Sequence, residues 1–180
     1  MQLRPHQQRA FDAMQEHDCG QVIIPTGGGK TYIMIADALH RAAQGQTIVV
    51  VAPRILLANQ LCEEFMEHIS GTWTHVCHAH SGETHYFSST KPEKIALFND
   101  TARAASESCI IFTTYHSLHR VVDSGINIDT IYFDEAHNGC GRHFHKAVFA
   151  TAQYAKRRYY FTATPKNGRG VSLSRGMNNT

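Results

Sequence analysis

Short runs of apolar residues alternate along the chain with longer segments in which apolar residues recur every three or four positions. Several short runs are continuous, such as Ile-Val-Val-Val at 48–51 and Cys-Ile-Ile-Phe at 109–112. Continuous runs of this kind are typical of strands that are covered on both faces, as in a parallel sheet. The pattern predicts strands at residues 21–25, 47–53, 75–80, 108–114, 130–134 and 158–163.

The longer segments predict helices between those strands. Apolar residues at positions 57, 61, 65 and 69 form one stripe along a helix. Residues 31–44 are apolar almost all round at their start, as expected of a helix buried against a sheet, and Gly45 suits its end. Pro92 suits the first turn of another helix. The predicted helices cover residues 5–17, 31–44, 54–70 and 91–105.

This alternation of strands and helices predicts an α/β fold, with a mostly parallel sheet that helices cover on both faces. In such sheets, ligands bind at the carboxyl ends of the strands. Residues 81–90 are polar and turn-rich, so we expect a loop there. We expect one domain over residues 1–165, and a linker or frayed end over the Gly-, Ser- and Asn-rich residues 166–180.

A glycine-rich turn joins the first predicted strand to the next helix, and this strand–loop–helix context is typical of a phosphate-binding loop. Consecutive glycines let backbone N–H groups converge on a phosphate, and the helix N-terminus adds its positive dipole end. The usual first glycine of the motif is replaced by Ile24, and the alternative is a plain glycine turn before a helix. The predicted phosphate-binding residues are Thr26, Gly27, Gly28, Gly29, Lys30 and Thr31.

An acidic box, Asp-Glu-Ala-His, follows the apolar residues 131–133 directly. Two adjacent carboxylates at the end of a buried strand are costly unless something binds there. Asp134 suits Mg²⁺ coordination, and Glu135 is placed to polarise an attacking water as a general base. Acidic strand ends also cap helices, so the box indicates a nucleotide site only in combination with the loop upstream.

The loop and the box together resemble those of the superfamily 2 helicases, in the branch that writes its acidic box as Asp-Glu-Ala-His. Residues 3–7, Leu-Arg-Pro-His-Gln, resemble the adenine-reading motif of that family. The resemblance implies that Gln7 hydrogen-bonds the adenine edge and that Arg4 lies over the base, whereas the alternative is a polar first turn of a helix. The pattern is most similar to the type III restriction-like helicases, including viral and phage members.

The resemblance implies a RecA-like ATP-binding domain with ATP and Mg²⁺ as its cofactors. Lys30 would contact the β- and γ-phosphates, and Thr31 and Asp134 would hold the Mg²⁺. The catalytic residues that it implies are Lys30, Asp134, Glu135 and His137.

Three further strings resemble motifs of the same family, in the family's order. Residues 51–54 and 113–115 resemble its first two nucleic-acid motifs, and the implied contacts are Pro53, Arg54, Thr113 and Thr114. The alternative for each is a strand-to-helix turn with an N-cap threonine. Residues 161–165 resemble the Thr-Ala-Thr motif, which implies that Thr162 and Thr164 couple the ATP site to the nucleic-acid site and that Thr162 meets His137.

The composition excludes few functions. It is 42% hydrophobic and 18% charged, no apolar run approaches the roughly 20 residues of a membrane span, and the N-terminus lacks a signal region. We therefore expect no membrane association and a cytoplasmic location, or the host cytoplasm or nucleus for a viral protein. The net charge of +2 permits nucleic-acid binding without arguing for it. Local basic candidates, equally readable as solvated surface, are Lys156, Arg157, Arg158, Lys166, Arg169 and Arg175.

Five cysteines and thirteen histidines invite a zinc hypothesis, particularly at residues 77–80 and 140–145. No Cys-x₂-Cys pair occurs there, and Cys77 and His78 would point to opposite faces of a strand. Reduced buried thiols and surface histidines are the favoured interpretation. The cluster Arg142, His143, His145 and Lys146 is a second hypothetical contact with nucleic acid.

Three functions fit these motifs. The favoured one is a nucleic-acid-stimulated ATPase of helicase or translocase type that acts on DNA or RNA, with a single-stranded track. The second is a nucleotide-binding regulatory or remodelling module that unwinds nothing. The third, a metabolic kinase, is disfavoured because residues 4–7 and 162–164 have no role in it.

We predict that the purified 180-residue chain binds ATP but hydrolyses it slowly. The motor of the family it resembles has a second RecA-like domain that supplies arginine fingers, and such a residue contributes about 10³–10⁵ in rate in comparable enzymes. Steady-state ATPase measurements check this expectation. A turnover equal to that of a complete two-domain helicase would show it to be wrong.

Overall fold

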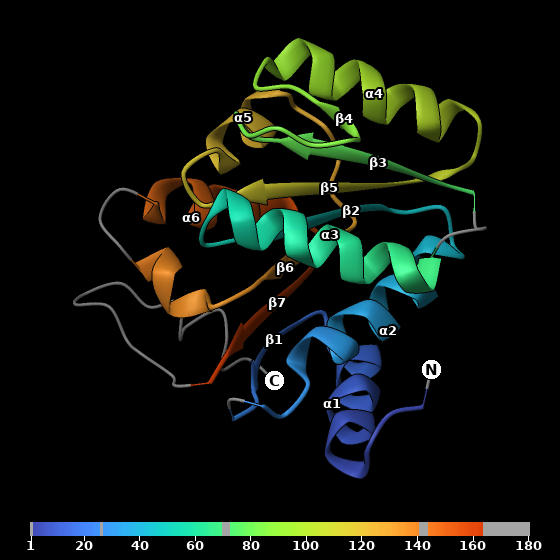
Figure 1. Cartoon of the computed structure of the whole chain (residues 1–180), viewed down its shortest axis with the longest axis vertical. Helices are drawn as coiled ribbons and strands as arrows, with labels where there is room; N and C mark the ends of the chain where they lie inside the picture. Colours follow the sequence, from blue (N-terminus) through green and yellow to red (C-terminus); the bar gives the residue numbers. More distant parts are fainter. Residues whose placement is uncertain (1, 26, 70–72, 141–143, 164–180) are drawn as a thin grey trace.

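The computed structural model of the chain describes residues 2–25, 27–69, 73–140 and 144–163. Within these ranges, seven strands form one sheet in the order β1-β7-β6-β2-β5-β3-β4, and every strand pair is parallel (Figure 1). The strands are β1 (Cys19–Ile23), β2 (Thr47–Ala52), β3 (Thr74–Ala79), β4 (Phe87–Ser88), β5 (Ser108–Thr114), β6 (Thr130–Phe133) and β7 (Arg157–Thr162).

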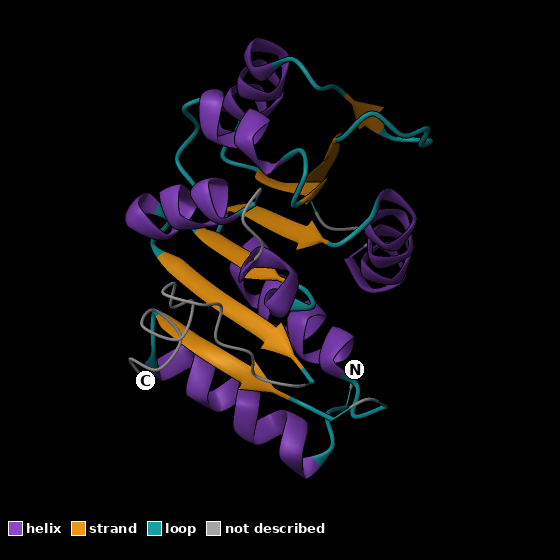
Figure 2. Ribbon diagram, turned by 90° about the vertical axis from the view of Figure 1, so that its left-hand side faces the viewer, coloured by secondary structure: helices purple, strands orange, loops and turns teal. Residues whose placement is uncertain are grey.

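Helices cover both faces of this sheet (Figure 2). One face packs against α1 (Pro5–Glu16), α2 (Lys30–Ala42) and α3 (Ile55–Ile69). The other face packs against α4 (Pro92–Ala104), α5 (Leu118–Asp123) and α6 (His145–Tyr154), and a 3-10 helix, η1 (Ala136–Cys140), follows β6. The predicted α/β fold with a sheet covered on both faces is therefore confirmed. None of the described helices has the length and apolar character that a membrane span requires.

The central strands are buried on both faces, as their continuous apolar runs predict. In β2, the side chains of Ile48 and Val50 belong to the core under α1–α3, whereas Val49 and Val51 belong to the core under α4–α6. All four are at most 1% exposed. Because successive side chains of a strand point to opposite faces, one uninterrupted apolar run fills both cores.

Many predicted boundaries differ from the structure by one or two residues, and two differences have a clear physical reason. The strand predicted over residues 21–25 is β1, which begins at Cys19 and ends at Ile23. Pro25 has no N–H for a ladder, and Gly20, a weak strand former, still pairs with Tyr159 of β7. The loop predicted over residues 81–90 contains β4, whose two residues pair with Cys77 and His78 of β3 and are too few to form a pattern.

The interpretation of the histidines as surface residues is wrong for His78 and His80, which are 0% and 1% exposed. Strand β3 lies inside the sheet, and the two rings satisfy part of each other's hydrogen bonding, with 3.0 Å between His78 Nδ1 and His80 Nε2. Cys77 lies in the core on the opposite face, as predicted. In the described part of the chain, no three His, Cys, Asp or Glu residues are grouped as metal ligands. The described thiols, all free and buried, are Cys19, Cys62, Cys77 and Cys109.

A buried polar network joins α1, α2 and the sheet. Asp37 of α2 is 0% exposed and pairs with Arg41 one turn later, 3.4 Å from Oδ1 to the guanidinium. The same carboxylate accepts hydrogen bonds from Gln15 of α1, at 2.7 Å, and from the hydroxyl of Tyr132 on β6. The ion pair with Arg41 and these hydrogen bonds therefore compensate the burial of this polar side chain in the core.

Replacing Asp37 with alanine should destabilise the protein by about 3–5 kcal/mol, because the guanidinium of Arg41 would stay buried without its partner. Urea unfolding followed by circular dichroism measures the effect. Asp12→Ala, an exposed acidic position on α1, is the matched control and should change stability by less than about 0.5 kcal/mol. Equal losses in the two variants would contradict the assigned role of the network.

Candidate active site at the carboxyl ends of β1, β7 and β6

The two chemical motifs meet at one edge of the sheet because β1, β7 and β6 are neighbours and run in the same direction. The glycine-rich loop follows β1, and the acidic box follows β6. Strand β7 lies between them and ends at Thr162, which pairs with Ile23 of β1. The Ile24 N–H donates to the Thr162 carbonyl at 3.1 Å, so the loop begins directly beside the end of β7.

Gly28 and Gly29 of the loop leave no space for a Cβ, and Gly27 and Gly29 have a left-handed backbone. Gly29 has φ +79°, a left-handed conformation that favours glycine, and it precedes the first residue of α2. A Cβ on Gly28 would come within 2.4 Å of Ile24 Cγ2 and 2.9 Å of the Pro25 carbonyl oxygen. Thr26, a predicted phosphate ligand, lies outside the described residues. Gly27 has φ +82° and is exposed, with open space where its Cβ would be.

The first turn of α1 holds this loop from the side. Nε2 of His6 lies 2.8 Å from the Gly28 carbonyl oxygen and therefore donates to it, and Gln7 Nε2 donates to the Gly29 carbonyl oxygen at 3.1 Å. Gln7 is 3% exposed, and its Oε1 accepts the backbone N–H of Arg4 at 2.8 Å. Both ends of the Gln7 amide are thus engaged within the protein, and its contact with adenine, like the stacking of exposed Arg4 on the base, stays a prediction.

Lys30 lies between the two carboxylates of the acidic box. Its ammonium is 3.4 Å from Asp134 Oδ1 and makes an ion pair with Glu135 Oε1. Asp134 is 6% exposed, and burial raises the pKa of its carboxyl, whereas the Lys30 charge opposes that rise. One ammonium faces two carboxylates, so when both are ionised this cluster has a net negative charge.

The backbone of the box is held in a strained shape. Glu135 has φ +48°, a left-handed conformation that a residue with a Cβ rarely adopts. Its carbonyl accepts both the backbone N–H of Asn138, at 2.9 Å, and the side-chain amide of that residue, at 3.0 Å. The buried Tyr115 hydroxyl donates to the Asp134 carbonyl at 2.8 Å. Strain that neighbouring bonds enforce is typical of functional sites.

His137 connects the box to the end of β7. Its Nδ1 lies 3.4 Å from Thr162 Oγ1 and 3.7 Å from Glu135 Oε2, and its Nε2 lies 3.4 Å from the amide nitrogen of Asn138. An amide nitrogen only donates, so Nε2 accepts and Nδ1 holds the proton of the neutral ring. That proton points towards Thr162 and Glu135. The predicted contact between His137 and Thr162 is therefore present, whereas Thr164 lies outside the described residues.

Thr31 is half-buried in the first turn of α2, next to Lys30. The turn therefore presents a hydroxyl and an ammonium side by side at the helix start. This arrangement is compatible with the predicted Mg²⁺ pair of Thr31 and Asp134, which stays a prediction. No role was assigned to His6, Tyr115 and Asn138 from the sequence. His6 and Tyr115 lie within the recognised motifs, and that position was a signal that could have identified them.

The proposed nucleic-acid residues lie one and two strands further along the same edge. Arg54 is exposed at the start of α3, beside half-buried Pro53. Thr113 is fully buried, and its hydroxyl donates to the Ala79 carbonyl at 2.7 Å. The Thr114 hydroxyl accepts the N–H of Ser117 at 3.2 Å. This bond is of the kind expected if residues 113–115 are only a strand-to-helix turn. Both side chains are buried, and their contact with nucleic acid stays a prediction.

The basic run at the start of β7 does not form an unpaired patch. Lys156 pairs with Asp129 at 3.3 Å, and Arg157 pairs with Asp18 at 3.2 Å. These residues also lie at the amino ends of the strands, away from the loop and the box. Of the second basic cluster, His145 and Lys146 begin α6. The remaining basic candidates, which lie outside the described residues, are Arg142, His143, Lys166, Arg169 and Arg175.

The sequence profile of the type III restriction enzyme res subunit matches residues 1–167 of the chain. The chain belongs to this family. Its motifs and fold place it among the superfamily 2 helicases, as an ATP-binding motor domain with a RecA-like fold, and the predicted resemblance is confirmed. No curated protein sequence matches the chain.

Several solved structures share the fold of this chain. A nuclease-deletion mutant of the Type ISP restriction-modification enzyme LlaGI, in complex with a DNA substrate mimic, is 22% identical with a TM-score of 0.71, covering 93% of this chain and 18% of that one. The Type ISP enzyme LlaBIII, bound to DNA, is 24% identical with a TM-score of 0.72, covering 92% and 13%. The Sulfolobus solfataricus SWI2/SNF2 ATPase core, in complex with dsDNA, is 21% identical with a TM-score of 0.64, covering 99% and 35%. The res-family chain thus spans between about an eighth and about a third of these proteins.

Replacing Gly29 with alanine should weaken ATP binding and destabilise the res-family domain. A Cβ there would lie 2.1 Å from Gln7 Nε2, so the hydrogen bonds from Gln7 to the loop would break. Gly125→Ala is the matched control, because Gly125 has φ +71° with open space around it. Both variants should lose about 1–2 kcal/mol from the left-handed backbone, measured by urea unfolding. Only Gly29→Ala should also lose nucleotide affinity by isothermal titration calorimetry, and equal affinities would contradict this account of the loop.

Proposed function

We propose that this domain binds Mg²⁺-ATP at the edge formed by β1, β7 and β6 and hydrolyses it in response to nucleic acid. The observation that carries the proposal is the position of the Lys30 ammonium between Asp134 and Glu135. A phosphate-binding lysine and two carboxylates meet within ion-pair distance, although more than a hundred residues separate them in the sequence. A structural ion pair alone would not need the glycine loop at its side.

The residues at this edge fit a nucleotide with a divalent cation. Oδ1 of Asp134 is buried, and the Lys30 ammonium, 3.4 Å away, is its one polar neighbour among the described residues. This carboxylate oxygen is a ligand of the kind that Mg²⁺ prefers. The glycine loop supports the fit, because a Cβ on Gly28 would clash with Ile24 and Pro25 and distort the turn. The box has two carboxylates and Lys30 has one positive charge. A divalent cation bound between the box and the triphosphate would compensate the remaining negative charge.

Each side chain has one task in the proposed reaction. Lys30 leaves its carboxylate partners and contacts the β- and γ-phosphates, and Asp134 and Thr31 hold the metal. When bound, the metal neutralises the charge that develops on the phosphate oxygens. Freed from Lys30, Glu135 orients a water and accepts its proton. His137, with its Nδ1 proton directed at Thr162 and Glu135, keeps the box in register with the end of β7.

The nucleic acid is proposed to cross the same edge, past Arg54 and the turn at residues 113–115. DNA is the first candidate, because LlaGI, LlaBIII and the SWI2/SNF2 core are described in DNA complexes. A helix N-terminus with a flanking arginine suits a backbone phosphate. We propose a single-stranded track, with a second RecA-like domain completing the ATP site in the working enzyme. A titration of the ATPase rate with single-stranded DNA separates this motor from a regulatory module, whose rate would not respond.

Lys30→Ala and Glu135→Gln should each reduce ATP turnover by at least about 10²-fold, for different reasons. The first change removes the contact with the phosphates and should also weaken ATP binding. The second removes the base but keeps the shape of the side chain, so ATP binding should persist. Turnover is measured by phosphate release, and binding by a fluorescent ATP analogue.

Asp12→Ala, on the outer face of α1, is the control for both variants and should keep wild-type binding and turnover. Normal hydrolysis by Glu135→Gln would show that another group activates the water. Normal ATP binding by Lys30→Ala would show that Lys30 does not contact the nucleotide, and the proposed site would be wrong.

A further inference from the structure

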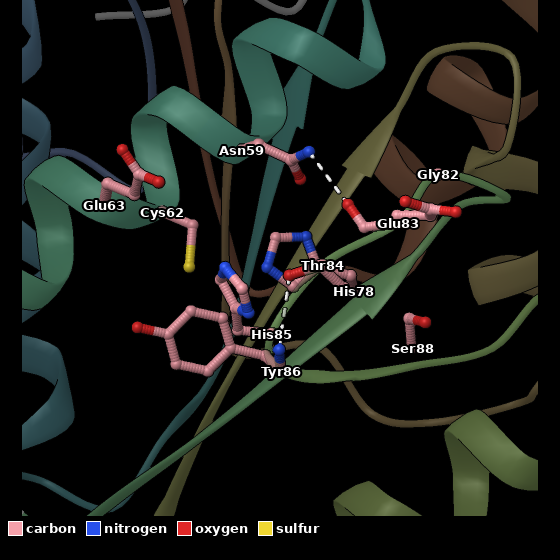
Figure 3. Close-up of a pocket in the computed structure, with 10 residues that line it drawn as sticks. All are labelled: Asn59, Cys62, Glu63, His78, Gly82, Glu83, Thr84, His85, Tyr86 and Ser88. Atoms are coloured by element: carbon pink, nitrogen blue, oxygen red, sulfur yellow. Dashed lines mark hydrogen bonds between the residues drawn. The ribbon is translucent and has the colours of Figure 1, made fainter.

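A cavity of about 710 Å³ lies on the face of the sheet that α1, α2 and α3 cover, towards the β4 edge, between α3 and the segment that joins β3 to β4 (Figure 3). Asn59 and Cys62 line it from α3, and His78, Thr84 and Tyr86 line it from β3 and the following segment. In Figure 3 these side chains turn towards a common space. Its size is that of a site for a small organic group.

The floor of the cavity presents a hydrogen-bond donor whose identity follows from its neighbours. The Gly82 N–H donates to His80 Nδ1 at 3.1 Å, so the proton of the neutral His80 ring is on Nε2. That proton is donated to His78 Nδ1 at 3.0 Å, which leaves the His78 proton on Nε2. Burial lowers the pKa of His78 to about 4 and also lowers the pKa of His80, so both rings are neutral near pH 7.

Two buried polar atoms of this cavity lack hydrogen-bond partners among the described residues. One is His78 Nε2, which carries the proton just assigned, on a side chain that is 0% exposed. The other is Asn59 Oδ1, an acceptor, whose amide nitrogen donates instead to the Glu83 carbonyl at 3.3 Å. Leaving a buried polar group unsatisfied costs free energy. A ligand that carries one acceptor and one donor would satisfy both.

Aromatic rings form one wall of the same cavity. The His78 ring lies between Phe112 and Tyr86, with centroid distances of 5.5 and 5.8 Å and interplanar angles of 26° and 22°. Tyr86 is half-buried, so part of its ring surface faces the cavity. Aromatic faces of this kind stack on flat, conjugated groups.

The charges around the cavity exclude a phosphate as its occupant. The carboxylates of Glu63 and Glu83 line it, and none of the described lysines and arginines does. Burial raises the pKa of Cys62 to about 12, so that part of the wall is a neutral thiol. A phosphate would be repelled here, whereas amino groups on a flat ring would find carboxylate acceptors.

The cavity adjoins the surface where nucleic acid is proposed to lie. Gly82 packs so closely against the first turn of α3 that a Cβ would come within 2.3 Å of Ile55 Cγ2, and Arg54 is the residue before Ile55. The Thr113 hydroxyl ties the end of β5 to the end of β3. A nucleic-acid strand whose backbone passes Arg54 would therefore lie beside this cavity.

We propose that this cavity binds one unstacked nucleobase of the single-stranded nucleic acid. The base would stack against Tyr86 and exchange hydrogen bonds with His78 Nε2 and Asn59 Oδ1. Every nucleobase has an acceptor and an N–H donor on its edge, so the pocket tolerates sequence, and the two carboxylates favour bases with an amino group. The phosphates stay outside, near Arg54. This inference rests on the proposed binding of nucleic acid.

Single-stranded DNA with one 2-aminopurine tests the proposal on the 180-residue chain. Stacking in the cavity should quench the fluorescence of the modified base, while polarisation of an end-labelled copy of the same strand measures total binding. Tyr86→Ala and Asn59→Leu should each weaken binding about tenfold. Tyr86→Phe should retain wild-type binding, because it keeps the stacking surface.

Phe87→Ala is the matched control. Phe87 is the next residue along the chain and 42% exposed, but it stacks on Phe98 outside the cavity at 4.9 Å, so its removal should leave the quenching unchanged. Circular dichroism melting of each variant checks that it folds. Asn59→Leu provides a second reading should Tyr86→Ala fail to fold.

Three outcomes are possible, and each decides the proposal. Quenching that Tyr86→Ala and Asn59→Leu lose, and Phe87→Ala keeps, supports it. Strand binding without quenching, or equal losses in Tyr86→Ala and Phe87→Ala, overturns it and leaves the proposed motor function intact. If no strand binds, the nucleic-acid part of the proposed function fails. Chemical shifts of labelled protein titrated with cytidine then decide the pocket, because changes at Asn59 and Tyr86 support a nucleoside site and their absence overturns it.

Discussion

Because every strand of the sheet runs in the same direction, every turn from a strand into the following segment emerges at one edge. This constraint brings the loop after β1 and the box after β6 together, with only β7 between them. It also puts Arg54 and the turn at residues 113–115 on the same edge, one and two strands further along. The helices on both faces make the constraint possible, because parallel strands need crossover connections that cover the sheet.

The same edge holds both incompletely compensated charge and a strained backbone. The acidic box has two carboxylates, one of them nearly buried, and the Lys30 ammonium compensates both in part. Glu135 keeps a left-handed backbone because Asn138 and Tyr115 hold the two carbonyls of the box. The folded chain therefore keeps these groups close without neutralising them, and the proposed metal would supply the missing positive charge.

The architecture was predictable from the sequence wherever the information is local. The apolar runs at 48–51 and 109–112 predict strands that are buried on both faces. The glycine loop and the acidic box are continuous stretches of sequence, so their chemistry can be predicted from adjacent residues. Contacts across space were not predictable in the same way. His6 hydrogen-bonds the carbonyl of a residue 22 positions away in the sequence. The two residues of β4 form a strand through their pairing with β3. The histidines His78 and His80 look like surface residues in sequence, since their burial depends on each other and on Phe112.

The hold of α1 on the glycine loop has a consequence for the direction of the loop's N–H groups. In a trans peptide, the carbonyl of one residue and the N–H of the next lie in one plane and point in opposite directions. By binding the carbonyls of Gly28 and Gly29, His6 and Gln7 turn the N–H groups of Gly29 and Lys30 away from α1. Two peptide planes are thus oriented before any anion arrives, so less conformational entropy is lost when one binds. A helix that need not touch the phosphate would in this way set part of the affinity for it.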